Sequence, residues 1–339
     1  MKRLISKNFA INFFTLLLAG LLPHAAYAAP QDSTASDSIN TAVDRIAAKA
    51  KYEFKYDLKE RQKLFWKVEH VTTTKTQIAG TTEEASARVE TLSSWEVGDV
   101  NKSSGEMVFQ NTITAIKAWK KVGQEEATLY DSRVSKNAPD EYVAIANGLG
   151  KTRSRITISP DGSVLDRQSD FVSTDFSTGD ITVPLPTKKV PVGYGWNVPT
   201  EFESTNEFGA AVQLKARTCY EFLKVKNGNG YISFRTEVLT PIESEKTKSK
   251  ILQKLVRGYI VWNFEKGLPV QKRTEWDEKV QGYDGADSYL KYVGRMSIKL
   301  VDSDEHKEAE KELTYTSLTP LKIAPIKLRK SNERPELRR

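Results

Sequence analysis

Two stretches of the chain, residues 95–109 and 220–234, are alike when they are aligned. WEVGDVNKSSGEMVF matches YEFLKVKNGNGYISF without a gap, with Glu, Val, Gly and Phe at equivalent places. Flanking pairs keep the same order: WKV at 66–68 corresponds to WNV at 196–198, and ITISPDGSVL at 156–165 to VWNFEKGLPV at 261–270. Such internal similarity is typical of duplicated architectures. We therefore expect two related units.

Alternation predicts the secondary structure of these units. Between 85 and 97 the odd positions are Ala, Ala, Val, Thr, Ser, Trp and Val, while most even positions are polar. This period of two is typical of a β-strand with one face in water. The same pattern places Met107, Phe109, Ile113, Ala115 and Trp119 on one strand face, and Ile232, Phe234, Thr236 and Val238 on another. The loops NKSSG and KNGNG should close hairpins, with Gly105 and Gly230 at positive φ.

Further strands are expected at 64–78, 260–276 and 290–300, where the alternation continues. One short helix per unit is expected, in PDEYVAIANGLG and in KSKILQKLVRG, where Ile251, Leu252, Leu255 and Val256 share a face. These helices should plug the curved sheets. The expected fold is mainly β (α+β): two tandem curved antiparallel sheets, pseudo-duplicated, each with one short helix, preceded by an N-terminal helix.

The ends of the chain suggest export. Residues 1–28 have a basic start, an apolar run and Ala26-Tyr27-Ala28, which together are typical of a signal peptide cleaved before Ala29. We expect no transmembrane helix after cleavage, and a periplasmic or extracellular protein. The expected organisation is a helical segment at 29–51, a first β-rich unit at 52–170, a Pro-rich connector at 171–190, a second unit at 191–301 and a charged, basic tail at 302–339.

The charge balance argues against a nucleic-acid partner. The chain has 51 Lys plus Arg and 44 Asp plus Glu. The signal segment and the last 18 residues hold the excess of bases, so the remaining body is close to neutral. Nucleic-acid binding requires a basic stripe across the fold, and none is seen. The single cysteine, Cys219, cannot form an internal disulfide and is expected to be a small buried side chain in a strand.

The chain has few residues of the types that bind metals or act as catalytic groups. Beyond the signal segment only His70, His306 and Cys219 could act as nitrogen or sulfur ligands of zinc, and His306 lies in a charged run expected to be solvated. Nucleotide-binding and serine-hydrolase motifs are missing. Carboxylates at Glu275, Asp277 and Glu278, and at Asp284 and Asp287, are best interpreted as surface groups. We expect no catalytic residue, cofactor or metal site, and a carboxylate-based hydrolase is the second alternative function.

The candidate ligand-lining residues are aromatic. Trp66, His70, Trp95, Trp196 and Trp262 fall on the inward faces of predicted strands. They could line a sheet concavity that holds an apolar or lipid-like molecule, although we expect the tryptophans, Trp66 and Trp196 among them, to be core residues, as buried aromatics usually are. The alternative is an envelope interaction or scaffold module that uses sheet edges and the basic tail to bind another envelope protein. The oligomeric state is left open.

The order of several segments along the chain resembles that of a known protein family. YDLKERQKLFWKVEH, the 95–109 hairpin, ISPDGSVL and PLPTKKVPVGYGW leading into a second copy are similar to an uncharacterised family of secreted bacterial β-rich repeat proteins. The likeness covers about residues 52–300 and rests on turn and core residues. It implies export and β-rich repeats and carries no activity. A looser similarity exists to the half-barrels of periplasmic lipoprotein carriers, at the level of fold alone.

Overall fold

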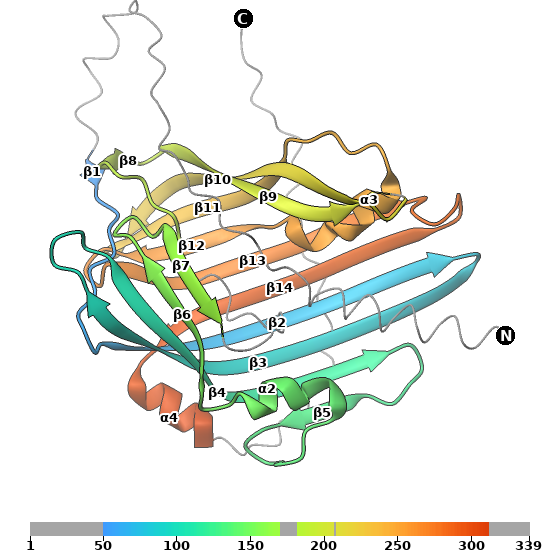
Figure 1. Ribbon diagram of the computed structural model, residues 1–339, viewed down its shortest axis with the longest axis horizontal. Helices are drawn as coiled ribbons and strands as arrows, with labels where there is room; N and C mark the ends of the chain where they lie inside the picture. Colours follow the sequence, from blue (N-terminus) through green and yellow to red (C-terminus); the bar gives the residue numbers. More distant parts are fainter. Residues whose placement is uncertain (1–49, 170–181, 207, 312–339) are drawn as a thin grey trace, which may run out of the picture.

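The fold is mainly β, as predicted, and is dominated by one large antiparallel sheet (Figure 1). The computed structural model describes residues 50–169, 182–206 and 208–311. The strands in these ranges are β1 (Lys51–Tyr52), β2 (Lys63–Ile78), β3 (Thr81–Val100), β4 (Met107–Val122), β5 (Thr128–Asp131), β6 (Thr152–Ile158), β7 (Val164–Ser169), β8 (Val190–Pro191), β9 (Gly195–Thr205), β10 (Ala211–Lys226), β11 (Asn229–Val238), β12 (Arg257–Asn263), β13 (Leu268–Gln281) and β14 (Tyr289–Val301). β1 and β8 pair separately as a small second sheet.

The two halves of the chain join edge to edge in this sheet. The strand order is β7-β6-β4-β3-β2-β14-β13-β12-β11-β10-β9, with β5 added beside β4. The expected tandem sheets are therefore continuous, because β14 returns antiparallel to β2 with its register running from Tyr289 opposite Gln77 to Val301 opposite Phe65. The order β7-β6-β4-β3-β2 of the first half corresponds to β13-β12-β11-β10-β9 of the second. Duplication itself stays a prediction.

The hairpin glycines agree with the alignment at one pair of turns and differ at another. Gly162 and Gly267 both have positive φ, between β6 and β7 and between β12 and β13. Gly105 also has positive φ, but Gly230 lies within β11 and does not. The second hairpin instead turns at Asn227 and Gly228, with φ of 50° and 71°. Asn-Gly favours such a two-residue turn, so the prediction for Gly230 is wrong.

Short helical segments lie where they were expected. They are η3 (Asp140–Tyr142) with α2 (Val143–Asn147), and α3 (Glu245–Lys250) with η4 (Leu252–Lys254). The second helix begins earlier than expected because the hydroxyl of Ser244 accepts the backbone N–H of Thr247 at its N-terminus. It ends before Leu255, which was expected within it. We call the sheet face that bears α2 the inner face, since Tyr142 and Ile145 pack against Val89, and the opposite face the outer face.

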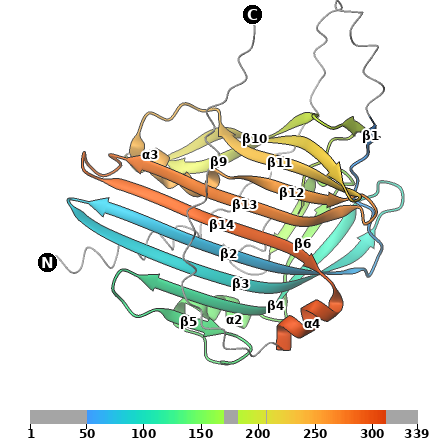
Figure 2. The same ribbon diagram turned by 180° about the vertical axis from the view of Figure 1, so that it is seen from behind.

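The main core is filled by extended chain rather than by helices, contrary to expectation. In Figures 1 and 2 the ends of the sheet curl over the long central strands, with β6 and β7 on one side and β9 on the other. The segment before β2 contributes Phe54, Tyr56 and Leu58, and the connector contributes Val183 and Leu185. Tyr56 accepts the backbone N–H of Val183 at 2.8 Å. Aromatic and β-branched side chains of both halves surround these residues: Trp66, Trp95, Phe109 and Ile158 with Phe222, Phe234 and Trp262.

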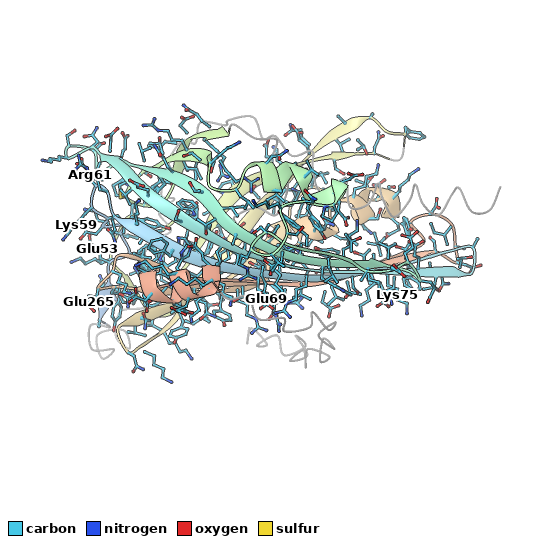
Figure 3. The ribbon with its side chains drawn as sticks, turned by 90° about the horizontal axis from the view of Figure 1, so that it is seen from below. Glu53, Lys59, Arg61, Glu69, Lys75 and Glu265 are labelled. Carbon is cyan, nitrogen blue, oxygen red and sulfur yellow. The ribbon has the colours of Figure 1, made fainter. Side chains whose placement is uncertain are left out.

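The C-terminal charged run forms a helix on the outer face. α4 (Ser303–Lys311) begins after Asp302, whose carboxylate accepts the backbone N–H groups of Asp304 and Glu305. His306 is buried against Phe65, and its Nε2 lies 3.3 Å from the hydroxyl of Thr114. The expectation that His306 is solvated is therefore wrong. Viewed edge-on, α2 and α4 lie on opposite sides of the sheet, and Glu69 and Lys75 project from the outer face (Figure 3).

Several sequence-based expectations lie outside the described residues. They are the signal segment at 1–28, the helix expected in the segment at 29–51, most of the Pro-rich connector and residues 312–339 of the basic tail. The described end of the connector, from Thr182, is packed into the main core. It therefore serves both units rather than only spacing them.

Candidate functional site

Four of the five candidate residues belong to the main core. The exposed fractions of Trp66, Trp95 and Trp262 are 2%, 3% and 1%. Trp262 packs edge-on against Tyr56 with ring centroids 4.9 Å apart, and Trp95 packs against Phe109 at 5.4 Å. These tryptophans lie on the inner face because they alternate with polar outer residues.

Trp196 differs from the other three because it is only half-buried. It lies on β9, an end strand of the sheet, and stacks on Tyr220 with centroids 5.2 Å apart and an interplanar angle of 11°. Its indole N–H donates to the carbonyl of Pro184 at 3.0 Å. Trp196 therefore ties the edge of the second half to the connector.

A group of polar side chains lies among the apolar residues on the inner face. It comprises Trp66 on β2, Thr91, Ser93 and Trp95 on β3, and Asn111 on β4, and we call it the polar floor. Each of these residues is no more than 4% exposed. Nevertheless both indole N–H groups, both hydroxyls and both amide atoms of Asn111 have no hydrogen-bond partner among the residues of the described ranges.

The strand register brings these residues together. Ser93 is directly opposite Trp66, and Trp95 is directly opposite Asn111. Thr91 is opposite Val68 and Ile116, so apolar side chains border the floor. A buried polar group left without a partner costs about 1–3 kcal/mol. Six such atoms in one place call for an explanation, because buried polar groups are normally hydrogen-bonded to protein or to ordered water.

His70 lies two residues beyond Val68 on the same inner face. Its ring centroid is 5.3 Å from that of Trp276, and its Nε2 is buried without a partner. Burial lowers the pKa of His70 from its ordinary value to about 4. The ring is therefore neutral at physiological pH, and it extends the line of unpartnered polar atoms from the floor toward the middle of the sheet.

The carboxylates considered for catalysis are dispersed. Glu275 lies on the outer face, where it pairs with Arg273 at 2.8 Å, and Asp277 lies 3.9 Å from Lys291. Trp276 between them is buried on the other side. Burial raises the pKa of Glu278, but this residue has no second carboxylate beside it on the inner face. Within the described ranges, no three His, Cys, Asp or Glu side chains are grouped as metal ligands.

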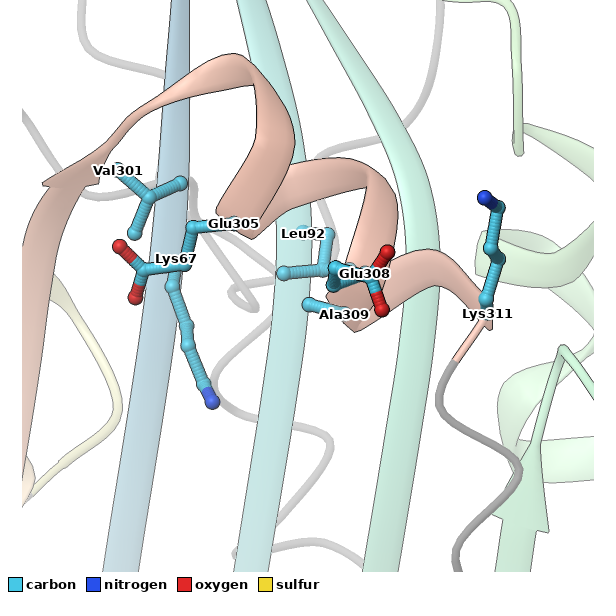
Figure 4. A pocket seen from close by; sticks show the side chains of 7 residues that line it. All are labelled: Lys67, Leu92, Val301, Glu305, Glu308, Ala309 and Lys311. Carbon is cyan, nitrogen blue, oxygen red and sulfur yellow. The ribbon is translucent and has the colours of Figure 1, made fainter.

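A pocket of about 400 Å³ lies on the outer face beneath α4 (Figure 4). Lys67 of β2 and Leu92 of β3 form one side, and Glu305, Glu308 and Ala309 of α4 form the other. Its lining mixes charged side chains with the apolar side chains of Leu92, Val301 and Ala309. It contains none of the candidate ligand-lining residues.

Thr91, Ser93 and Asn111 are the inner-face residues that the aromatic criterion missed. A signal was present, because Thr91 and Ser93 occupy the same odd positions as Trp95 and Val97 in the alternating pattern. Polar residues on the apolar face of a strand are unusual enough to mark a site. For Asn111, the position two residues beyond Phe109 gave the same indication.

Comparison with known proteins leaves the family open. No family model matches the chain, and no curated protein matches it. Among solved structures it is similar to lipovitellin, described in terms of lipid–protein interactions, with 9% identity and a TM-score of 0.41 over 73% of this chain. The match spans 26% of the lipovitellin chain.

A second likeness, to a domain of Vibrio parahaemolyticus described as an outer membrane lipoprotein-sorting protein, has 8% identity and a TM-score of 0.12 over 72% of this chain and 91% of that one. Neither TM-score is high enough to establish a shared fold, so neither carries an argument about function. The resemblance to secreted repeat proteins stays a prediction. No helix in the described part of the chain has the length and apolar character to cross a membrane.

Proposed function

We propose that this protein is an exported, non-catalytic binding protein that holds an apolar or lipid-like ligand on the inner face of its curved sheet. The observation that carries the proposal is the polar floor, a set of unpartnered hydrogen-bonding atoms surrounded by apolar side chains. Ligand sites commonly combine a mostly apolar lining with a few polar groups that fix orientation.

The chemistry of the floor favours a neutral polar group on the ligand. Trp66 and Trp95 offer one N–H donor each and the amide of Asn111 offers two, and Ser93 and Thr91 offer hydroxyls. None of these side chains is ionised, so the floor suits a carbonyl, ester or hydroxyl better than a charged head, which would lose its hydration without gaining a counter-ion. Such a group at one end of an apolar molecule would satisfy the floor, while the rest contacts the surrounding core.

The sheet edge at β9 supports this function over the alternative interaction module. An open edge can recruit another strand. β9 contains Pro199, and Glu201 and Glu203 are two of its outward residues. Proline and outward charges discourage strand addition.

The test is ligand retention combined with substitution of the floor. Protein purified from the compartment to which it is exported is examined by native mass spectrometry for a retained small molecule, and binding of an anilinonaphthalene dye is measured by fluorescence. Asn111→Leu and Ser93→Ala should keep or raise the melting temperature, because they remove unpartnered buried atoms, while they weaken ligand retention. Ser94→Ala, on the outer face of the same strand, is the control.

The outcomes separate binding from packing. Loss of stability in Asn111→Leu, with no ligand retained and no dye bound by the wild type, would show that the floor serves only internal hydrogen bonding. Equal loss of ligand in Ser94→Ala would show that retention does not depend on the inner face.

A further inference from the structure

A groove of about 620 Å³ crosses the outer face of the second half, away from the polar floor. It runs over β9 to β13, and its lining is rich in hydrogen-bond donors: Asn197, Arg217, Ser233, Arg235, Arg257 and Tyr259. Gly195 and Gly258 are also part of its lining. The groove is open to solvent, whereas the inner-face floor is enclosed.

Two of the three arginines of this groove are held in place by a carboxylate, and the third is not. The carboxylate of Glu237 accepts the Nε–H of Arg217 and the Nε–H of Arg235, each at 2.9 Å. These two guanidinium groups lower the pKa of Glu237 to about 2, so it stays ionised and keeps both of them positioned. Among the residues that the structure describes, Arg257 has no ion pair, and its Nη2 is buried without a hydrogen-bond partner.

The register makes this arrangement costly without a counter-ion. Arg235 and Arg257 are directly opposite each other on β11 and β12, and like charges in that relation repel. Glu275 is opposite Arg257 on its other side, but it pairs with Arg273 at 2.8 Å. Arg257 therefore faces a second guanidinium. Burial raises the pKa of Glu278 and the charge of Arg257 acts to lower it, but no carboxylate of the described residues forms an ion pair with Arg257.

Elsewhere in this sheet, two like charges that face each other on neighbouring strands are bridged by a residue of opposite charge. Glu69 and Glu90 are directly opposite each other on β2 and β3 of the outer face. Arg88 lies between them and contacts both, at 2.9 Å from Glu69 and 2.5 Å from Glu90. In the described part of the chain no carboxylate bridges Arg235 and Arg257 in this way, because Glu237 contacts Arg217 and Arg235.

We propose that this groove binds a phosphate-type oxyanion between Arg235 and Arg257, either as a free phosphate ester or as the headgroup of an anionic lipid. Guanidinium groups recognise such oxygens through paired, charge-assisted hydrogen bonds. Ser233 and Tyr259, which are opposite each other beside the two arginines, add hydroxyl donors. Glu221 also lines the groove, so the anion is placed on the arginine side of it.

Cys219 lies in the same groove, opposite Arg235. It is only partly buried there, so the expectation of a buried side chain is wrong, and it is a binding neighbour rather than a nucleophile. Burial, followed by the hydrogen bond with Glu237, raises the pKa of its thiol. The thiol therefore stays protonated, and the groove binds its ligand without a covalent step. This site is independent of the proposed inner-face ligand, so the two can fail separately.

The test measures binding of inorganic phosphate by calorimetry, and of phosphatidylcholine vesicles with and without phosphatidylglycerol by co-sedimentation, using the full mature chain. Arg257→Gln should weaken binding at least about tenfold because it removes a charge-assisted partner. It should keep or raise the melting temperature, because it removes one of two opposed positive charges and breaks no ion pair among the described residues. Arg235→Gln, a largely exposed position, provides a second variant if Arg257→Gln does not fold. Arg155→Gln removes one exposed positive charge from the first half and should bind as the wild type does.

Each outcome decides the proposal. Phosphate binding that depends on Arg257 supports a free phosphate ester, and Arg257-dependent binding to phosphatidylglycerol vesicles alone supports a lipid headgroup. Binding to neither probe at low salt, or equal weakening by Arg155→Gln, overturns the site. Retention of the wild-type affinity in both Arg257→Gln and Arg235→Gln does the same.

Discussion

Individual side chains show how far aromatic positions can be interpreted from sequence. Trp66 and Trp196 begin their halves at equivalent places, and both were expected to be core. Trp66 is fully enclosed, whereas Trp196 on the end strand is held by stacking and by one hydrogen bond to Pro184. Equivalent positions therefore differ in burial, because only one of them has a strand on each side.

This difference predicts unequal costs of truncation. Trp66→Ala should destabilise the protein by about 3–5 kcal/mol, since the surrounding core cannot fill the volume of an indole. Trp196→Ala should cost about 1–3 kcal/mol, the usual range for a partly exposed site. Urea denaturation followed by circular dichroism measures both. Equal costs at the two positions would contradict the burial seen at Trp196, and Trp196→Phe separates loss of stacking from loss of the hydrogen bond.

His70 predicts a pH dependence of stability. Its pKa is lowered to about 4 by burial, whereas the unfolded chain has an ordinary value near 6.5. As the pH falls below about 6.5, the unfolded chain takes up the proton first, so stability should fall by up to about 3 kcal/mol by pH 4. His70→Gln should lose this part of the pH dependence, as measured by urea denaturation at pH 7, 5 and 4. His306 is present in both proteins, so its contribution cancels, and parallel pH profiles would rule out a buried neutral His70.

At the scale of elements, the period of two predicted the long strands well but not the irregularities within them. β3 and β4 have the expected alternation, yet Thr114 is an extra residue in β4 between the pairs Leu92–Ala115 and Ser93–Ile113. This bulge turns Ala115 and Trp119 to the outer face, although the sequence placed them with Phe109 and Ile113. Ile116 and Ala118 take the inner positions instead.

The bulge residue Thr114 also contacts the helix α4, which the sequence did not predict. The hydroxyl of Thr114 lies 3.3 Å from Nε2 of His306, and Arg133 donates to the carbonyl of Ala309 at 2.7 Å. Both partners are about 170 or more residues away in sequence, so the charged run from 302 onward looked solvated. Asp302 before Ser303 was a local capping signal, but docking of the helix depends on tertiary contacts that no pattern within the run reveals.

The two hairpin turns predict different responses to the same substitution. Gly105 and Gly228 have φ of 73° and 71°, so alanine is strained at either position. At Gly105 a Cβ would also lie 2.7 Å from Cγ of Pro160, whereas at Gly228 it would meet nothing within 4 Å. Gly105→Ala should therefore lower stability by about 1 kcal/mol more than Gly228→Ala, in the range of small overpacking effects. Thermal unfolding of the two variants side by side measures this, and a larger loss at Gly228 would contradict the contact with Pro160.

At the scale of the whole molecule, the sequence predicted repeated units but not how they meet. Tandem units joined by a Pro-rich connector left open whether the two units share one core. In the structure the main core combines Trp66 and Phe109 with Phe222 and Trp262, and the pairing of β14 with β2 continues the sheet from one half to the other. Contacts between halves depend on which strand edges remain open after each half has folded, and alternation within one strand carries no information about this.

The shared core predicts that neither half folds alone. A fragment ending at residue 169 would expose the inner faces of Trp66 and Phe109 and the free edge of β2, while one beginning at residue 182 would expose Phe222, Trp262 and the edge of β14. Apolar surface of that extent drives association, since burial stabilises by about 25 cal/mol per Å². Each fragment should lack a cooperative urea transition in tryptophan fluorescence, whereas an equimolar mixture should regain one. The control is the full chain cut at a protease site inserted between residues 170 and 181, which should keep its transition because the contacts between the halves are already formed. A cooperative transition in either fragment by itself would mean that the halves are independent domains and that their common sheet is only an interface between them.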